Sequence, residues 1–154
     1  MSDAYKNIIF VCAEWYVITG QIKYHLYVIM NIQYDSLLHV YQEHNHQIEN
    51  IKFQYLHLLS FLTNTPMIST EEFIDKITEI SKMGDILICY SIDNEKITIL
   101  GSGTIIYEPK IIHGCKNVGH IEDIVVHTNY RSHGIAKDIF KPSIFIGNFY
   151  FIKI

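Results

Sequence analysis

Residues Gly119–Ala136 read GHIEDIVVHTNYRSHGIA, and this stretch decides the fold. Its first part, Gly119–Val126, is an apolar run that predicts a β-strand. The run carries two adjacent carboxylates, Glu122 and Asp123, which from the pattern alone could also be a solvent-facing or ion-paired couple. Successive side chains of a strand point to opposite faces, so the two carboxylates cannot share one role unless a bulge interrupts the strand.

The second part of the stretch places Arg131-x-x-Gly134-x-Ala136 at the start of a predicted helix. Main-chain N–H groups at a helix start are unpaired and lie at the positive end of the helix dipole. Small residues there keep side chains away from the backbone, so that an anion can approach. Arg131 is the only arginine of the chain and adds a planar, charged donor group. The spacing therefore predicts a phosphate-binding loop between a strand and a helix.

Outward from this stretch, the preceding residues alternate between helical and strand patterns. Ser69 and Glu72 have the spacing of a capping box, and the helix that they open is predicted to close at Gly84. An earlier helix around Leu56–Leu62 is predicted to end near Thr63. The predicted strands are Asp85–Ser91 and Ile97–Tyr107, joined by a turn at 93–95 and followed by a link at Lys110–Lys116. This order predicts an α/β (α+β) fold with a mixed, mainly antiparallel sheet flanked by helices.

Both ends of the chain are less regular. We expect a strand over Tyr24–Gln33, a helix that starts over Ser36–Tyr41, and a polar loop over Gln42–Gln47. Pro142 should end the helix that begins near Gly134, and Ile144–Ile154 is predicted to form one more strand.

Composition excludes several classes of protein. The chain has 154 residues, enough for one domain, with 49% hydrophobic and 18% charged residues and a net charge of −4. This balance argues against a nucleic-acid partner, and no apolar run reaches the roughly 18–20 residues that span a bilayer. The sequence predicts no metal site. Its three cysteines form no CxxC pair, and His44 and His46 have no visible third ligand. We therefore expect a cytoplasmic protein that binds no membrane.

Two segments also carry a family resemblance. RSHGIA, Arg131–Ala136, resembles the pyrophosphate-binding pattern of the GNAT acetyltransferase superfamily. KIIHGCKNVGHIEDIVV, Lys110–Val126, followed by YRSHGIAK, resembles the glucosamine-6-phosphate N-acetyltransferase family within it. The resemblance covers residues 56–141, which we interpret as the acetyltransferase core, between a poorly matching segment at 1–55 and an atypical tail at 142–154. It implies a GNAT-like sheet, acetyl-CoA as co-substrate, small-molecule substrates and a homodimer.

The resemblance also implies roles for individual residues. Acetyl-CoA is expected to contact two sets of residues, the strand end Ile124, Val125 and Val126 and the loop Arg131, Ser132, His133, Gly134, Ile135 and Ala136. The amino-sugar phosphate site is expected to include Thr63, Lys110, Ile111, Ile112, His113, Glu122, Asp123 and Ile124. Lys110 and His113 are also compatible with ordinary surface positions, Thr63 with a helix end, and His120 with a satisfied structural histidine.

The implied reaction is direct transfer of an acetyl group to the amine of glucosamine 6-phosphate, on the route to UDP-N-acetylglucosamine. The amine must be neutral to attack, so a carboxylate that accepts its proton assists the reaction. We take Glu122 as the first candidate and Asp123 as the second. A strand bulge, which the superfamily has at this place, would free main-chain N–H groups for the oxyanion.

The chain departs from the family after Pro142. Members of the family continue with a longer helix, further strands and a tyrosine that protonates the leaving thiolate. Tyr150 is the only tyrosine of the tail, but its surroundings do not match, so it receives no role. We therefore expect a C-terminally truncated chain with an incomplete sheet. Two alternatives stay open, namely a non-catalytic remnant that binds coenzyme A or a partner, and an acetyltransferase for another amine.

Overall fold

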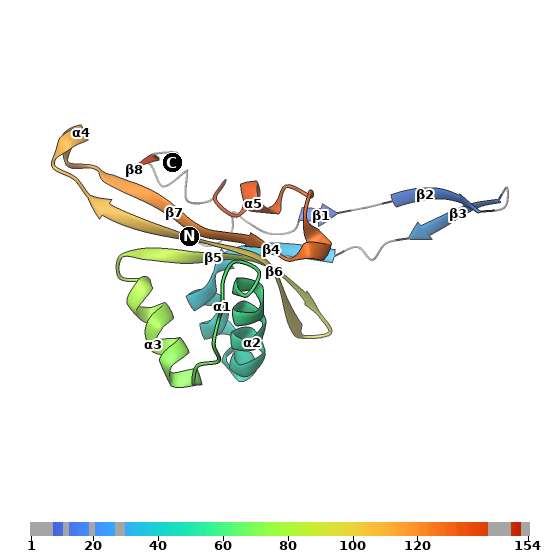
Figure 1. The fold of residues 1–154 in the computed structure, drawn as a ribbon, viewed down its shortest axis with the longest axis horizontal. Helices are drawn as coiled ribbons and strands as arrows, with labels where there is room; N and C mark the ends of the chain where they lie inside the picture. Colours follow the sequence, from blue (N-terminus) through green and yellow to red (C-terminus); the bar gives the residue numbers. More distant parts are fainter. Residues whose placement is uncertain (1–7, 11–12, 19–20, 27–29, 142–148, 152–154) are drawn as a thin grey trace.

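The computed structural model describes residues 8–10, 13–18, 21–26, 30–141 and 149–151. Within these ranges, six strands form one sheet in the order β1-β4-β5-β6-β7-β8, and β2 and β3 form a separate hairpin (Figure 1). The strands are β1 Ile8–Phe10, β2 Ala13–Ile18, β3 Gln21–Leu26, β4 Met30–Ser36, β5 Gly84–Asp93, β6 Lys96–Pro109, β7 Asn117–Val126 and β8 Phe149–Phe151. Neighbours in the sheet are antiparallel except β7 and β8, which are parallel. The predicted mixed, mainly antiparallel sheet is confirmed.

Helices lie on both faces of this sheet. They are α1 Leu37–Glu43, α2 Ile48–Leu59, α3 Thr70–Ile80, α4 Ile112–Cys115 and α5 Ile135–Asp138, with short 3-10 helices η1 Asn45–Gln47 and η2 Thr128–Tyr130. α1, α2 and α3 cover one face, and α5 lies on the other (Figure 1). In the part of the chain that is described, no helix has the length and apolar composition needed to cross a membrane.

Two apolar cores result, one on each face of the sheet. Ile88 and Tyr90 of β5 pack with α1, α2 and α3 in the larger core. Cys89, between them in the sequence, points to the opposite face. It packs there with Ile135 of α5 and with Ile139, which follows α5. This alternation is the period-2 pattern of a strand that is covered on both faces.

The predicted helix starts are confirmed at two serines. Ser69 Oγ accepts a hydrogen bond from the Glu72 main-chain N–H at 3.1 Å, and Glu72 Oε2 accepts one from the Ser69 N–H at 2.8 Å. This reciprocal pair is the capping box that the sequence predicts. Ser36 Oγ accepts from the His39 N–H at 3.1 Å and caps α1.

Three local predictions are corrected. A single strand over Tyr24–Gln33 is wrong, because these residues are divided between β3, which pairs with β2, and β4, which pairs with β5. The helix before Thr63 is longer than its leucine cluster, since α2 begins at Ile48 and ends at Leu59. Gly84 does not cap a helix. It is the first residue of β5, and a side chain there would lie 2.0 Å from the main-chain oxygen of Ile105.

The end of the chain adds one strand to the sheet. α5 begins at Ile135, after Gly134, as predicted, but it ends at Asp138, before the predicted end at Pro142. β8 is the described part of the strand predicted over Ile144–Ile154, and it pairs with Asn117–Gly119 of β7. Pro142 and the rest of the tail lie outside the described residues.

Side-chain amides of α2 hold this helix against the edge of β6. β7 pairs with β6 only from Gly101 onward, so the earlier edge of β6 has no strand partner among the described residues. The side-chain amide of Gln54 pairs with this edge in place of a strand. Its Nε2 donates to the Ile97 oxygen at 2.7 Å, and its Oε1 accepts from the Ile99 N–H at 2.9 Å. Gln54 thus satisfies strand groups that water or another chain would otherwise meet.

Candidate active site

A bulge interrupts β7 at the two carboxylates. Ser102 of β6 pairs with Val125 and Thr104 pairs with Glu122, so Asp123 and Ile124 together face a single residue of β6. Asp123 has a φ of +51°, in the left-handed region. Glu122, Asp123 and Ile124 are all exposed. The bulge that the resemblance implied is therefore present, and it removes the strict alternation that would separate the two carboxylates.

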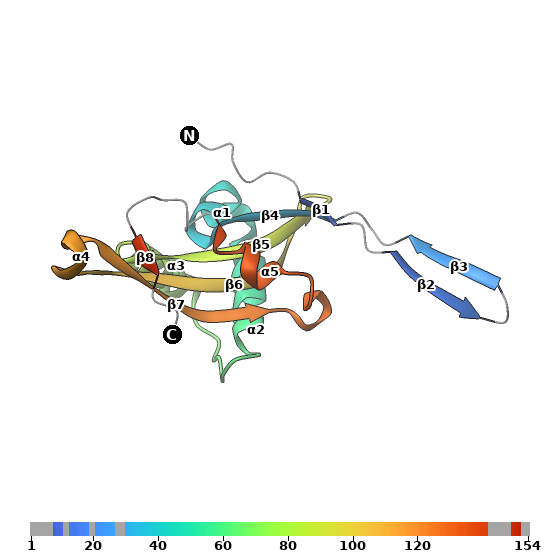
Figure 2. The ribbon, with the colours of Figure 1, turned by 90° about the horizontal axis from the view of Figure 1, so that it is seen from above.

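The outer edge of β7 is open beside this bulge. β8 pairs with β7 only at 117–119, and no strand among the described residues pairs with 120–126 on that side (Figure 2). Val126 is opposite Gly101, and the next N–H, of His127, donates to the Leu100 oxygen at 2.9 Å. This pattern marks a non-hydrogen-bonded pair, so the main-chain groups of Val126 point to the open edge, whereas those of Val125 point to β6.

The loop after β7 has two left-handed residues and several available N–H groups. Ser132 has a φ of +67° and Gly134 a φ of +81°, and open space surrounds the position where Gly134 would carry a side chain. Within residues 30–141, no acceptor pairs with the main-chain N–H groups of Ser132, Gly134, Ile135 and Ala136. All but Ile135 are exposed. The predicted phosphate-binding loop is thus placed at the surface with its donors available.

Arg131 and His133 brace this loop. Arg131 Nε donates to the Val126 oxygen at 3.0 Å, which ties the loop to the open edge of β7. His133 Nδ1 lies 2.7 Å from the Arg131 oxygen. The remaining N–H groups of the Arg131 guanidinium have no acceptor among the described residues and face solvent on an exposed side chain.

Two glycines of β6 allow α5 to approach the sheet, a role that the sequence pattern did not reveal. A side chain at Gly101 would lie 2.9 Å from Ile135, and one at Gly103 would lie 2.3 Å from the ring of Phe140. Ile135 and Phe140 are buried, at 2% and 5% exposure. The position of the loop therefore depends on this close packing beneath it.

The residues predicted to bind the amino-sugar phosphate do not gather at one place. Thr63 is exposed in the turn after α2. Lys110, Ile111 and Ile112 lie at the far tip of the β6–β7 hairpin, around α4 (Figure 1), with Ile111 90% exposed. The register puts five residues of β7 between this tip and Glu122, about 17 Å at the usual rise per residue.

The hairpin tip has its own ion pairs. Lys110 contacts the Glu108 carboxylate, and His120 Nε2 lies 2.9 Å from Glu108 Oε2. Lys110, and then His120, hold the pKa of the Glu108 carboxyl below its usual range. His120 is thus paired across the two strands. His113 belongs to α4, and the position of its side chain is outside the described part of the structure.

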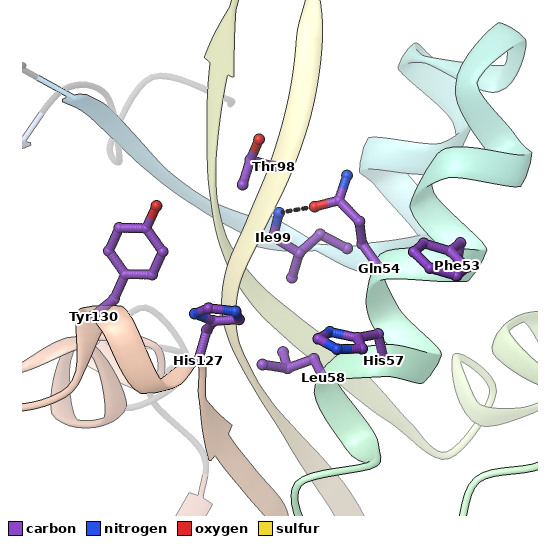
Figure 3. Close-up of a pocket in the computed structure, with 8 residues that line it drawn as sticks. All are labelled: Phe53, Gln54, His57, Leu58, Thr98, Ile99, His127 and Tyr130. Atoms are coloured by element: carbon purple, nitrogen blue, oxygen red, sulfur yellow. Dashed lines mark hydrogen bonds between the residues drawn. The ribbon is translucent and has the colours of Figure 1, made fainter.

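A pocket between α2 and η2 was not anticipated from the sequence. Its lining residues are Phe53, Gln54, His57, Leu58, Thr98, Ile99, His127 and Tyr130, and its volume is about 470 Å³, part of which is open to solvent (Figure 3). We call it the α2–η2 pocket. The spacing of Phe53 and His57 along α2 is the sequence signal for it. No cluster of three or more metal-binding side chains occurs among the described residues.

Comparison with known proteins gives one family. The model of the acetyltransferase (GNAT) family matches residues 37–142, a range that begins before the predicted core boundary at residue 56. A probable glucosamine 6-phosphate N-acetyltransferase of Drosophila melanogaster is 31% identical over 83 residues, which are 54% of this chain and 38% of that protein. The Candida albicans glucosamine 6-phosphate N-acetyltransferase is 40% identical over 73 residues, 47% of this chain and 49% of that protein.

Solved structures agree on the fold. Glucosamine-6-phosphate N-acetyltransferase from Arabidopsis thaliana has a TM-score of 0.59 at 21% identity and covers 80% of this chain and 83% of that chain. A Trypanosoma brucei acetyltransferase has a TM-score of 0.58 at 23% identity, with 80% and 84% covered. In the sequence comparisons above, the chain spans half or less of the relatives' own length.

Proposed function

The chain belongs to the GNAT acetyltransferase family, and we propose that it transfers the acetyl group of acetyl-CoA to the amine of glucosamine 6-phosphate. One observation carries the proposal, namely that the open edge of β7, its bulge and the donor-rich loop adjoin one another. The relatives named for this reaction support the choice of acceptor.

Coenzyme A fits the open edge and the loop. An extended pantetheine arm has amide groups that hydrogen-bond as an added strand does. The Val126 N–H faces this edge, while the Val126 oxygen accepts from Arg131 Nε. The pyrophosphate would accept from the N–H groups of Ser132, Gly134, Ile135 and Ala136, and Arg131 would add a charge-assisted bond. The thioester would then lie next to the bulge at Asp123 and Ile124.

Acetyl transfer at the bulge needs a base and an oxyanion site. The nitrogen lone pair of the amino sugar attacks the thioester carbonyl, the C–S bond breaks, and coenzyme A leaves as the thiolate. The amine proton passes to the Glu122 carboxylate, directly or through water, and Asp123 is the second candidate. The bulge leaves main-chain N–H groups of β7 outside the ladder, where they can donate to the oxyanion.

We propose a homodimer as the active form, because one chain does not assemble the whole acceptor site. Lys110 suits a sugar phosphate as a point charge, but it lies about 17 Å along the hairpin from the bulge. The hairpin tip of a second copy could supply it. Light scattering on the purified chain would give the dimer mass if this is right and the monomer mass if it is wrong. The exposed free thiol of Cys115 is compatible with a reducing compartment, and we propose the cytoplasm.

The test is release of free thiol from acetyl-CoA in the presence of glucosamine 6-phosphate. We expect release that depends on both substrates. Release with other amines, but not with this one, would show a different acceptor. Binding of coenzyme A without release would leave a non-catalytic member of the family, and absence of both would refute the proposal.

A further inference from the structure

The α2–η2 pocket is not used in the steps described above, and it is built from aromatic rings on two sides. On α2, Phe53 and His57 stack at a centroid distance of 6.3 Å and an interplanar angle of 13°. Opposite them, the rings of His127 and Tyr130 lie 5.6 Å apart. His57 and His127 approach to 6.3 Å across the pocket (Figure 3).

Main-chain contacts fix the η2 side of the pocket. The Tyr130 N–H donates to the His127 oxygen at 2.9 Å, which closes the turn. The Asn129 N–H donates to His127 Nδ1 at 3.3 Å. Because Nδ1 accepts, the neutral ring carries its proton on Nε2, and His127 presents a donor. The η2 wall is therefore held by hydrogen bonds within the protein.

The pocket offers only a few polar groups to a ligand. The hydroxyls of Thr98 and Tyr130 have no hydrogen-bond partner among the described residues, and they join His127 Nε2 as available groups. Gln54 is not available, because its amide is used by Ile97 and Ile99. No carboxylate, lysine or arginine lines the pocket. Apolar faces with a few hydroxyl and imidazole groups suit a flat, neutral heteroaromatic ring rather than a sugar phosphate or a cation.

The pocket wall and the phosphate-binding loop are neighbours along the chain. Tyr130, on its wall, directly precedes Arg131, which opens the loop. Consecutive Cα atoms are 3.8 Å apart, so the pocket wall and the loop share one short turn of chain. A ligand that carries a flat base and a pyrophosphate on one ribose can reach both places.

From this arrangement we infer that the α2–η2 pocket receives the adenine ring of coenzyme A, which stacks on the Phe53 and His57 side and accepts hydrogen bonds from the groups of the opposite rim. The inference rests on the proposed use of acetyl-CoA. It assigns the pocket to the nucleotide half of the molecule, whereas the open edge of β7 takes the pantetheine half.

The experiment compares two probes on the purified full chain by titration calorimetry. Coenzyme A has the adenine nucleotide, and 4′-phosphopantetheine lacks it. The variants are Phe53→Ala and His57→Ala, both at exposed positions of α2, and the matched control is Met67→Ala, an exposed apolar side chain outside the pocket. Removing a ring that stacks on a base should weaken coenzyme A binding by about tenfold.

We expect this loss for coenzyme A in both pocket variants, unchanged 4′-phosphopantetheine binding, and no loss for either probe in Met67→Ala. Unchanged coenzyme A affinity in the pocket variants would overturn the inference while leaving the proposed function intact. Equal loss for both probes would also overturn it, since the effect would not be specific to adenine. Failure of the unmodified chain to bind either probe would refute the proposed function, and the inference with it.

Discussion

The packing of α5 on β6 can be tested by adding one methyl group at Gly103. The Cβ of Gly103→Ala would lie 2.3 Å from Phe140 Cζ and 2.8 Å from Cε2. Carbon atoms in contact normally stay about 3.5–4.0 Å apart. Phe140 is only 5% exposed, so its ring cannot turn out to solvent without leaving the core on the α5 side.

Insertion of an extra methyl group into such a core costs about 1–3 kcal/mol. For a chain of this size, each kcal/mol lowers the melting temperature by roughly 2–4 °C, so Gly103→Ala should melt about 2–12 °C below the unmodified chain. Because α5 follows the loop directly, we also expect weaker coenzyme A binding.

Thermal unfolding followed by circular dichroism measures the effect, with the neighbouring Ser102→Ala as control. Among the described residues, the buried Ser102 hydroxyl has no hydrogen-bond partner. Ser102→Ala adds no volume and removes this unpaired group, so it should leave the melting temperature equal or higher. The double variant Gly103→Ala/Phe140→Leu should recover part of the loss. An unchanged melting temperature in Gly103→Ala would refute the close packing that places the loop.

Three further changes test other parts of the molecule. Glu122→Gln should lower acetyl transfer by about a hundredfold or more while coenzyme A affinity stays within about twofold, as expected for a base that acts on the amine; equal loss of both would make Glu122 structural. Gln54→Leu should lower the free energy of unfolding by about 1–3 kcal/mol in urea titration, because it leaves the Ile99 N–H unpaired, whereas Asn50 Nδ2 still donates to the Ile97 oxygen at 3.1 Å. An unchanged midpoint would show that water replaces the amide. Burial raises the pKa of Asp85 to about 6. The hydrogen bond from the Ile86 N–H lowers this pKa in part, and the like charge of Asp35 raises it further. Because the pKa of Asp85 is raised in the folded state, its protonated carboxyl contributes fully to stability below pH 3.8. This contribution is lost as the pH rises through about 6. The advantage in melting temperature of Asp85→Asn over the unmodified chain should therefore grow from pH 4 to pH 7.5, and a constant difference would contradict the shift.

Sequence patterns predicted the helices and strands whose ends are set by residues close together in the chain. The capping box at Ser69 needs only residues three apart, and the strand, turn and helix around Arg131 are set by a short stretch of chain. The bulge at Asp123 was different, because apolar patterning does not reveal which residue leaves the ladder. The family resemblance supplied it, and the register confirms it.

Features that depend on distant contacts were not predictable in this way. The polar run before Ile48 suggested a loop, but Gln47 of that run contacts the start of β6. Its Nε2 donates to the Glu95 oxygen at 2.6 Å, and its Oε1 accepts from the Ile97 N–H at 3.1 Å. Gly103 has no local signature, since only the arrival of Phe140 requires it. The α2–η2 pocket likewise combines α2 with residues about seventy positions later, and no single segment shows it.

The most direct test of the central claim observes the loop amides themselves. In a ¹⁵N–¹H spectrum titrated with coenzyme A, the N–H resonances of Ser132, Gly134, Ile135 and Ala136 should shift strongly and become protected from hydrogen exchange, as amides that bind the pyrophosphate. The Asp138 N–H, which already donates to the Gly134 oxygen at 3.0 Å, should keep its protection. Binding of coenzyme A that leaves the four loop amides unshifted and freely exchanging would contradict the claim.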